Sequence, residues 1–150
     1  MTGAGPEIGR VMGIDFGEKR TGVAVSDPTG TLASPLTTLA RRAGKRPPLK
    51  DLEALARSHD VVGLVVGLPL DLKGKETEWC REVRRAGDEL GRRLAIPVEY
   101  IDERFSSVQA TRALRASGLP KSQRERKDRV DRAAAAVVLQ AWLDRRGGAR

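Results

Sequence analysis

The sequence contains few of the side chains that carry redox and zinc chemistry. Among its 150 residues there is one cysteine and one histidine. Cys80 cannot form a disulfide within the chain, and together with His59 it supplies too few ligands for a zinc site. We expect Cys80 to pack on a helix and His59 to lie at the surface near a helix end. We therefore expect neither redox nor zinc chemistry to be the basis of the function.

Aromatic side chains and long apolar runs are also scarce. Phe, Trp and Tyr together make up 3% of the residues, which argues against a module that binds nucleic acid mainly by stacking bases on rings. No apolar run approaches the roughly 18 residues that suggest a membrane span. The first dozen residues lack the charged start and the apolar stretch of a signal peptide. We therefore expect a cytoplasmic protein with no membrane partner.

Charged residues, in contrast, are abundant and unevenly placed. They make up 32% of a chain that has the length of one domain and is 39% hydrophobic. The formal net charge is +8, and residues 104–150 hold 12 Lys and Arg against 4 Asp and Glu, so this segment carries the whole excess. Such a segment favours a polyanionic partner such as nucleic acid. Solvated helix faces are the alternative interpretation.

The hydrophobic pattern predicts one α/β domain. Apolar and β-branched runs indicate strands at 11–17, 21–26, 31–39, 61–67 and 96–103. Apolar residues at helical spacing indicate helices at 49–56, 76–94, 106–116 and 130–143. The charged segment 121–129 is expected to be an exposed loop, and residues 1–7 and 145–150 are expected to be flexible. Three antiparallel strands followed by alternating strands and helices give a mixed sheet.

Acidic residues stand where two of the predicted strands end. Asp15 closes an apolar strand between two glycines, where a packing residue would be expected, although an ordinary turn aspartate is an equal alternative. Asp102 and Glu103 close the last strand, and strand alternation sends them to opposite faces, so one of them can readily join Asp15. Burying a carboxylate without a counter-charge or a metal costs several kcal/mol. Such acids are therefore usually paired, liganded or exposed at the rim of a sheet.

A third acid, Asp131, is predicted at the start of the last helix. The alanines that follow it allow this helix to approach the sheet closely, while Asp128 is a competing candidate one turn earlier. By itself, Asp131 is better explained as an acid favoured by the helix dipole. Three acids from separate elements, without usable His or Cys clusters, suit a hard cation such as Mg²⁺ or Mn²⁺. Two such ions can promote phosphodiester hydrolysis.

Four motifs carry a resemblance to a known family. They are Gly13–Gly17 with Gly22–Asp27, Val66–Leu70 with Gly74, Asp102–Ser107 with Gln109-Ala110, and Val130-Asp131 with Ala133-Ala134 and Val138–Gln140. Together these motifs span nearly the whole chain. The sequence resembles the YqgF family, also called RuvX, a group of Holliday junction resolvases with an RNase H-like fold.

The resemblance implies a fold and an active site. The fold is a five-stranded mixed sheet, three antiparallel strands and then two parallel ones, flanked by helices. The catalytic and metal-binding acids are Asp15, Glu103 and Asp131, with Mg²⁺ or Mn²⁺ as cofactor. The choice of Glu103 over Asp102 follows from the resemblance and not from spacing. The implied functions are resolution of four-way DNA junctions and trimming of the precursor of small-subunit ribosomal RNA at its 5′ end.

Basic residues near these motifs are candidates for contact with the nucleic-acid backbone, and plain solvation is an equal alternative for each. The candidates are Lys19, Arg20, Arg104, Lys121, Arg124, Arg126, Lys127 and Arg129. A resolvase that cuts two strands symmetrically is expected to be a homodimer.

Two rival functions remain. A non-catalytic RNA-binding module would use the basic segment and leave the acids structural. The first motif also resembles the phosphate-binding hairpin of sugar kinases and actin-type ATPases. Those proteins place two such domains around the nucleotide, and 150 residues supply one.

Overall fold

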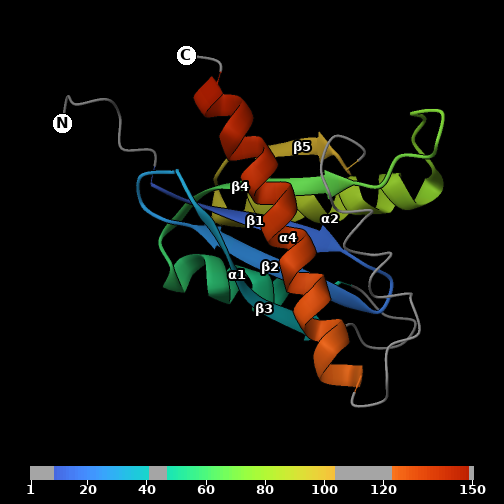
Figure 1. Cartoon of the computed structure of the whole chain (residues 1–150), viewed down its shortest axis with the longest axis horizontal. Helices are drawn as coiled ribbons and strands as arrows, with labels where there is room; N and C mark the ends of the chain where they lie inside the picture. The colour runs from blue at the N-terminus through green and yellow to red at the C-terminus, as the bar shows by residue number, and fades with distance from the viewer. Residues whose placement is uncertain (1–8, 41–46, 104–122, 149–150) are drawn as a thin grey trace.

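The computed structural model describes residues 9–40, 47–103 and 123–148. The elements are β1 (Arg10–Phe16), β2 (Arg20–Ser26), β3 (Ala33–Ala40), α1 (Leu49–Ser58), β4 (Val61–Leu68), α2 (Glu78–Leu94), β5 (Val98–Asp102) and α4 (Gln123–Gly148). The strands form one sheet in the order β3-β2-β1-β4-β5. β2 is antiparallel to both β1 and β3, whereas β4 is parallel to both β1 and β5. The predicted five-stranded mixed sheet is confirmed (Figure 1).

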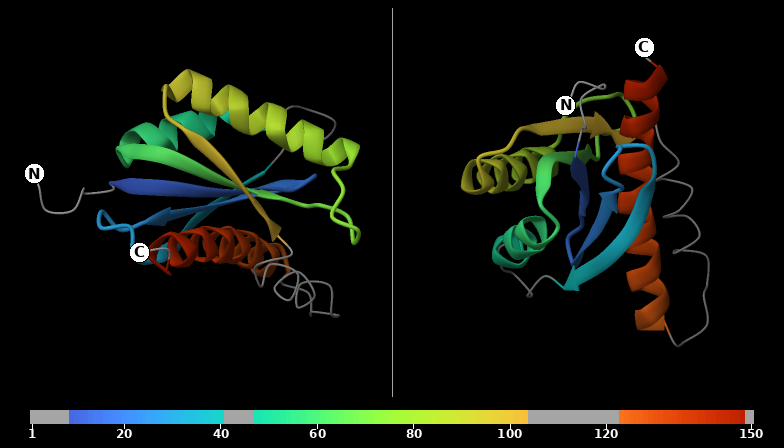
Figure 2. Two further views of the ribbon diagram at one scale, coloured as in Figure 1. Left: turned by 90° about the horizontal axis from the view of Figure 1, so that it is seen from above. Right: turned by 90° about the vertical axis from the view of Figure 1, so that its left-hand side faces the viewer.

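Helices cover both faces of the sheet. α1 and α2 lie on one face and α4 crosses the other, as Figure 2 shows from above. Strand alternation divides the apolar side chains between the two faces. Met12, Ile14 and Val66 join the core beneath α1 and α2. The second core, beneath α4, includes Val65 and Leu139. A sheet buried on both faces explains why β4 is nearly all apolar.

The helix α2 shows how local sequence sets an element. Its apolar residues recur on one side, and Cys80 and Leu90 are fully buried there. The Thr77 hydroxyl accepts a hydrogen bond from the backbone N–H of Cys80, which caps the first turn. Cys80 therefore packs on a helix, as predicted. His59 caps the end of α1 and is half-buried.

The prediction of a loop in the charged segment before the last helix is wrong. The exposed loop predicted for 121–129 is largely helical, since α4 begins at Gln123. Arg, Lys, Glu and Gln are good helix formers, so a polar, charged run does not by itself indicate a loop. Asp131 therefore lies more than two turns inside α4 rather than at its start. The dipole effect fades within the first turn, so it does not explain this acid.

Several other expectations have simpler outcomes. The third strand begins two residues later than predicted, at Ala33. The helix expected at 106–116 lies outside the described residues, as does the segment 1–7. α4 continues through most of the expected flexible tail, to Gly148. Among the described helices, none is both long and apolar enough to cross a membrane.

Candidate active site

Asp15 lies near the carboxyl end of β1, on the face that α4 covers. Its side chain is 5% exposed. On β2 its partner across the sheet is Gly22. On β4 its neighbour is Gly67, one residue beyond the pair formed by Ile14 and Val66. Asp15 thus has a glycine on each side, which leaves room above both neighbouring strands.

The room above Gly22 is filled by the backbone of α4. A β-carbon added to Gly22 would lie 1.9 Å from the carbonyl oxygen of Asp131 and 3.1 Å from the nitrogen of Arg132. The helix can therefore rest directly on the strand only because position 22 has no side chain. This contact buries Asp131, which is 4% exposed. The close approach expected of the alanine-rich helix is present.

The room above Gly67 is filled by the carboxylate of Glu103. A β-carbon at position 67 would lie 2.8 Å from Glu103 Oε1. Glu103 directly follows β5 and is 2% exposed. Its neighbour Asp102 ends β5 beside Leu68 and is half-buried. The burial of Glu103 over Gly67 supports Glu103 rather than Asp102 as the partner of Asp15.

Asp15, Glu103 and Asp131 therefore lie on the same face of the sheet, over neighbouring strands. Asp15 stands between the position covered by Asp131 and the position covered by Glu103, and adjacent strands are only about 4.8 Å apart. Within the described ranges, these three are the only acidic residues that are buried. Buried carboxylates are usually paired with cations or with hydrogen-bond donors.

One source of positive charge is Arg20 on β2. Its Nε donates to Asp131 Oδ2 at 2.5 Å, and the two side chains are 23% and 6% exposed. Arg20 and Gly22 are two residues apart on one strand, so both point to the α4 face. This ion pair was not foreseen, because Arg20 was expected to contact phosphate. It places a partly exposed guanidinium at the rim of the acid cluster.

The three acids fit a hard divalent cation by the chemistry of their donors, since all of them are carboxylate oxygens. Across 9–40, 47–103 and 123–148, no three Asp, Glu, His or Cys side chains are gathered closely enough to hold a metal ion. Asp128, the competing candidate, lies within α4, and the structure does not describe its side chain.

The predicted phosphate contacts stay predictions. Lys19, in the turn between β1 and β2, and Lys127 and Arg129, on α4, are exposed. Arg124 and Arg126 lie on the first turn of α4, but their side chains are not described. Arg104 and Lys121 lie outside the described residues.

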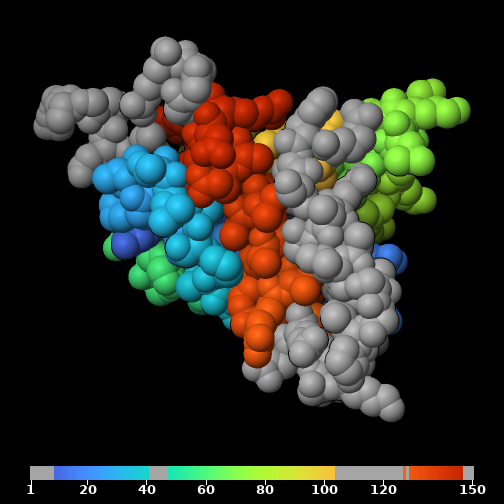
Figure 3. Space-filling model, in the orientation of Figure 1, coloured from blue at the N-terminus to red at the C-terminus, as the bar shows by residue number. Residues whose placement is uncertain are grey.

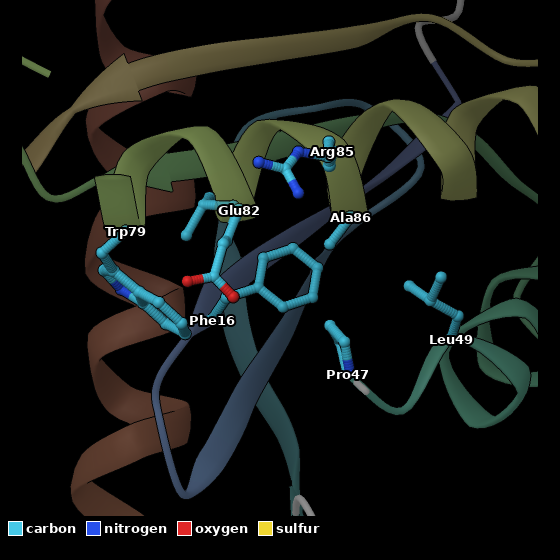
Figure 4. Close-up of a pocket in the computed structure, with 8 residues that line it drawn as sticks. Phe16, Pro47, Leu49, Trp79, Glu82, Arg85 and Ala86 are labelled. Atoms are coloured by element: carbon cyan, nitrogen blue, oxygen red, sulfur yellow. The ribbon is translucent and has the colours of Figure 1, made fainter. Parts of the chain in front are cut away.

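A separate hollow lies on the opposite face of the sheet. It has a volume of about 340 Å³ and is lined by Phe16, Trp79, Glu82 and Arg85, among others. Figure 4 shows the Phe16 ring between α2 and the start of α1. Phe16 follows Asp15 on β1, so the two side chains point to opposite faces. The hollow is therefore not part of the acid cluster.

Sequence reasoning missed the two glycines that shape the site. Gly22 and Gly67 stand inside strands, where glycine weakens the strand and often marks a close approach by another backbone or side chain. That signal was present in the sequence. It could not reveal what approaches, because Asp131 and Glu103 are distant along the chain.

The fold defines the class of protein first. A structure of Thermus thermophilus RuvC in complex with a Holliday junction substrate is similar to this chain with a TM-score of 0.55. The similarity covers 93% of this chain and 96% of that chain, at 15% sequence identity. At this identity the likeness concerns the fold alone. The chain thus has the RNase H-like fold of RuvC.

The sequence then defines the family. Residues 9–145 match the family model described as "RuvX: Holliday junction resolvase". Relatives from Koribacter versatilis and an Anaeromyxobacter species, both named "Putative pre-16S rRNA nuclease", are 42% and 44% identical to it. They align with 93% and 91% of this chain and with 89% and 98% of their own lengths. The chain belongs to the RuvX family, a family of nucleases, and the resemblance noted in the sequence is confirmed.

Proposed function

We propose that this protein is a metal-dependent endonuclease that hydrolyses phosphodiester bonds in folded nucleic acid. The observation that carries the proposal is that Asp15, Glu103 and Asp131 are all buried, with Asp131 and Glu103 lying over Gly22 and Gly67, the glycines on the strands beside Asp15. The family description points to Holliday junctions and the names of the relatives point to precursor 16S ribosomal RNA. Hydrolysis of the backbone uses the same acids whether or not the sugar has a 2′-OH.

In this proposal each side chain has a defined task. Asp15, Glu103 and Asp131 would hold Mg²⁺ or Mn²⁺ through their oxygens, and the ion would supply water activation and charge compensation for hydrolysis. Arg20 releases Asp131 and pairs with a phosphate of the substrate instead. The exposed Lys19 and Lys127 bind flanking phosphates.

The test is cleavage of two labelled substrates, a four-way DNA junction and a precursor ribosomal RNA. Each is incubated with protein in Mg²⁺, in Mn²⁺ and in chelator. We expect product with the metals and none with chelator. Binding without any metal-dependent product would instead identify a non-catalytic RNA-binding module. The substrate that is cut faster defines which of the two activities is the main one.

Matched variants test the assignment of the acids. We expect a large fall in the cleavage rate from each of the variants Asp15→Asn, Glu103→Gln and Asp131→Asn. The fall should exceed the roughly 10–100-fold loss that is typical when a residue that hydrogen-bonds to a metal ligand, rather than the ligand itself, is replaced. Binding measured in chelator should persist. Asp102→Asn is the control, because Asp102 is adjacent in sequence yet only half-buried. Activity lost in Asp102→Asn and kept in Glu103→Gln would reverse the assignment.

The proposal also includes a location and an assembly. We propose that the protein works in the cytoplasm. Symmetric cleavage of two strands calls for a two-fold dimer on the junction. Sedimentation of the protein with and without the junction tests the dimer, and a monomer on a cleaved junction would contradict it.

A further inference from the structure

The loop between β4 and α2, residues 69–77, carries a very exposed apolar side chain. Leu72 is 89% exposed, against 61% for Leu32 and 46% for Val62, the other exposed large apolar residues of the described part of the chain. Its neighbours Lys73 and Lys75 are exposed too. A single exposed leucine is ordinary on a protein surface. Whether Leu72 has a role depends on where it lies and on how the loop holds it in place.

The location is the edge of the sheet that holds the acids. β1, β4 and β5 are parallel, and their arrowheads point the same way in Figure 1, with the loop beyond them. The loop starts directly after Leu68, which pairs with Asp102, the residue before Glu103. In the space-filling view the yellow-green atoms of this segment stand out from the body of the protein (Figure 3). Nucleic acid bound at the acids therefore lies within reach of this loop.

The tip of the loop is closed by its own hydrogen bonds. Asp71 Oδ1 accepts from the backbone N–H groups of Lys73 and Lys75, both at 2.9 Å. The Asp71 N–H donates to the Lys75 carbonyl at 3.0 Å, and the Gly74 N–H donates to the Asp71 carbonyl at 2.9 Å. Gly74 has a φ of 80°, which favours glycine. The turn holds Leu72 outward.

The ends of the loop are fixed to α2. The Cys80 thiol donates to the Pro69 carbonyl at 3.2 Å. At the other end, Glu76 forms an ion pair with Arg84 at 2.7 Å. Since Glu76 is paired and Asp71 is turned onto its own backbone, Lys73 and Lys75 are the outward charges. A loop that is already ordered loses little conformational entropy on binding.

We propose that Leu72 is a wedge that packs against an unstacked nucleobase of the substrate while Lys73 and Lys75 bind the adjacent phosphates. This proposal rests on the proposed nuclease function, because it assigns the same substrate to both sites. Apolar side chains of this size insert at unstacked base steps, and lysines neutralise phosphates. Unstacking is easiest where bases are unpaired or strained. The loop therefore directs the acids to branch points and strand ends rather than to continuous duplex.

The test reads the base directly and does not depend on cleavage. A four-way DNA junction and an RNA helix with a single-stranded end each carry 2-aminopurine at the branch or at the first unpaired position. Both are titrated with protein in chelator. We expect binding to raise the 2-aminopurine fluorescence at least about twofold, because unstacking relieves its quenching. A continuous duplex with the same label should show no rise.

Variants assign the effect to the loop. Leu72→Ser should abolish the rise while the protein still binds, with an unchanged unfolding midpoint because the side chain is exposed. The control is Leu32→Ser, the same change at an exposed leucine in the turn between β2 and β3, which lies at the opposite edge of the sheet. It should behave like the wild type. Lys73→Ala and Lys75→Ala should each weaken binding. Each should also reduce the slope of the logarithm of the binding constant against the logarithm of salt concentration by about 1, the value for one lost phosphate contact.

The outcomes separate the two proposals. An equal rise with Leu72→Ser and with the wild type overturns the wedge, even if cleavage is found. A rise that depends on Leu72 in a protein without metal-dependent cleavage keeps the wedge and overturns the nuclease. A protein that binds neither labelled probe overturns the wedge.

Discussion

The two faces of the sheet draw different residue types from the same strands. Toward α1 and α2, β1 and β4 present large apolar side chains such as Ile14 and Leu64, which are buried in one continuous core. Toward α4, near their carboxyl ends, the same strands present Asp15 and Gly67. Successive residues of one strand thus stabilise the fold on one side and form the candidate site on the other. Substitutions on the two faces should therefore separate stability from activity.

The largest effect is expected from Gly22→Ala, which acts on both properties. The new methyl group would overlap the backbone carbonyl of Asp131, so α4 must move away from the sheet. We expect a loss of about 3 kcal/mol or more in the free energy of unfolding, at the upper end for overpacking. Denaturant titration measures it. Gly63→Ala is the control, since its nearest neighbour would be at 3.9 Å, and an equal loss there would contradict the explanation.

Leu64→Ala should affect stability alone. Leu64 is 2% exposed beneath α1 and α2, and truncating such a leucine typically costs about 2 to 5 kcal/mol. The cleavage rate per folded molecule should stay close to the wild-type rate at a temperature where the variant is folded. A large fall in that rate, with the fold intact, would show that the two faces are coupled.

Arg20→Gln tests the charge balance on the α4 face. It leaves the buried Asp131 carboxylate without the guanidinium. In chelator we therefore expect the free energy of unfolding to fall by about 1 to 3 kcal/mol. This is less than the loss for a fully buried pair, because the Arg20 side chain is 23% exposed. Mn²⁺ should raise the unfolding midpoint of this variant more than that of the wild type, since Asp131 is then available to the ion. Equal shifts would contradict competition between Arg20 and the metal.

Gly67→Ala should affect activity more than stability. Its methyl group would lie 2.8 Å from Glu103 Oε1, at the end of a side chain that can move aside, and 3.1 Å from Val138 Cγ2, which must shift by only a few tenths of an ångström. We expect a fall of roughly tenfold in the cleavage rate, equivalent to about 1.4 kcal/mol. Gly63→Ala, on the same strand and the same face, should leave the rate unchanged. A rate equal to wild type in Gly67→Ala would show that the position of Glu103 is not critical.

The smallest effect concerns the edge of the sheet away from the acids. Backbone N–H of Leu32, the Thr29 hydroxyl and backbone N–H of Thr31 all donate to Asp27 and lower its pKa to about 2. A depressed folded-state pKa adds stability above the unfolded value near 4, and this is lost as the pH falls toward 2. When the free energy of unfolding is measured against pH by denaturant titration, Asp27→Asn should make its fall between about pH 4 and pH 2 slightly less steep. A steeper fall would contradict the role of Asp27.

The sequence determined the elements because their signals are local. Strand alternation, helical spacing and turn residues lie within a few positions of one another, and they were sufficient for the sheet order once the resemblance was recognised. The start of α4 was the exception, since charged residues form helices as readily as they form loops. The three acids could be named from the sequence, but alternation alone left Asp102 and Glu103 equal.

Only the tertiary structure decided what surrounds those acids. Gly22 meets Asp131, Gly67 meets Glu103 and Arg20 pairs with Asp131, and each contact joins residues far apart along the chain. No local pattern encodes which element will cover a glycine, because that depends on how α4 and β5 pack on the sheet. The same packing leaves Leu72 exposed at the edge where the acids lie.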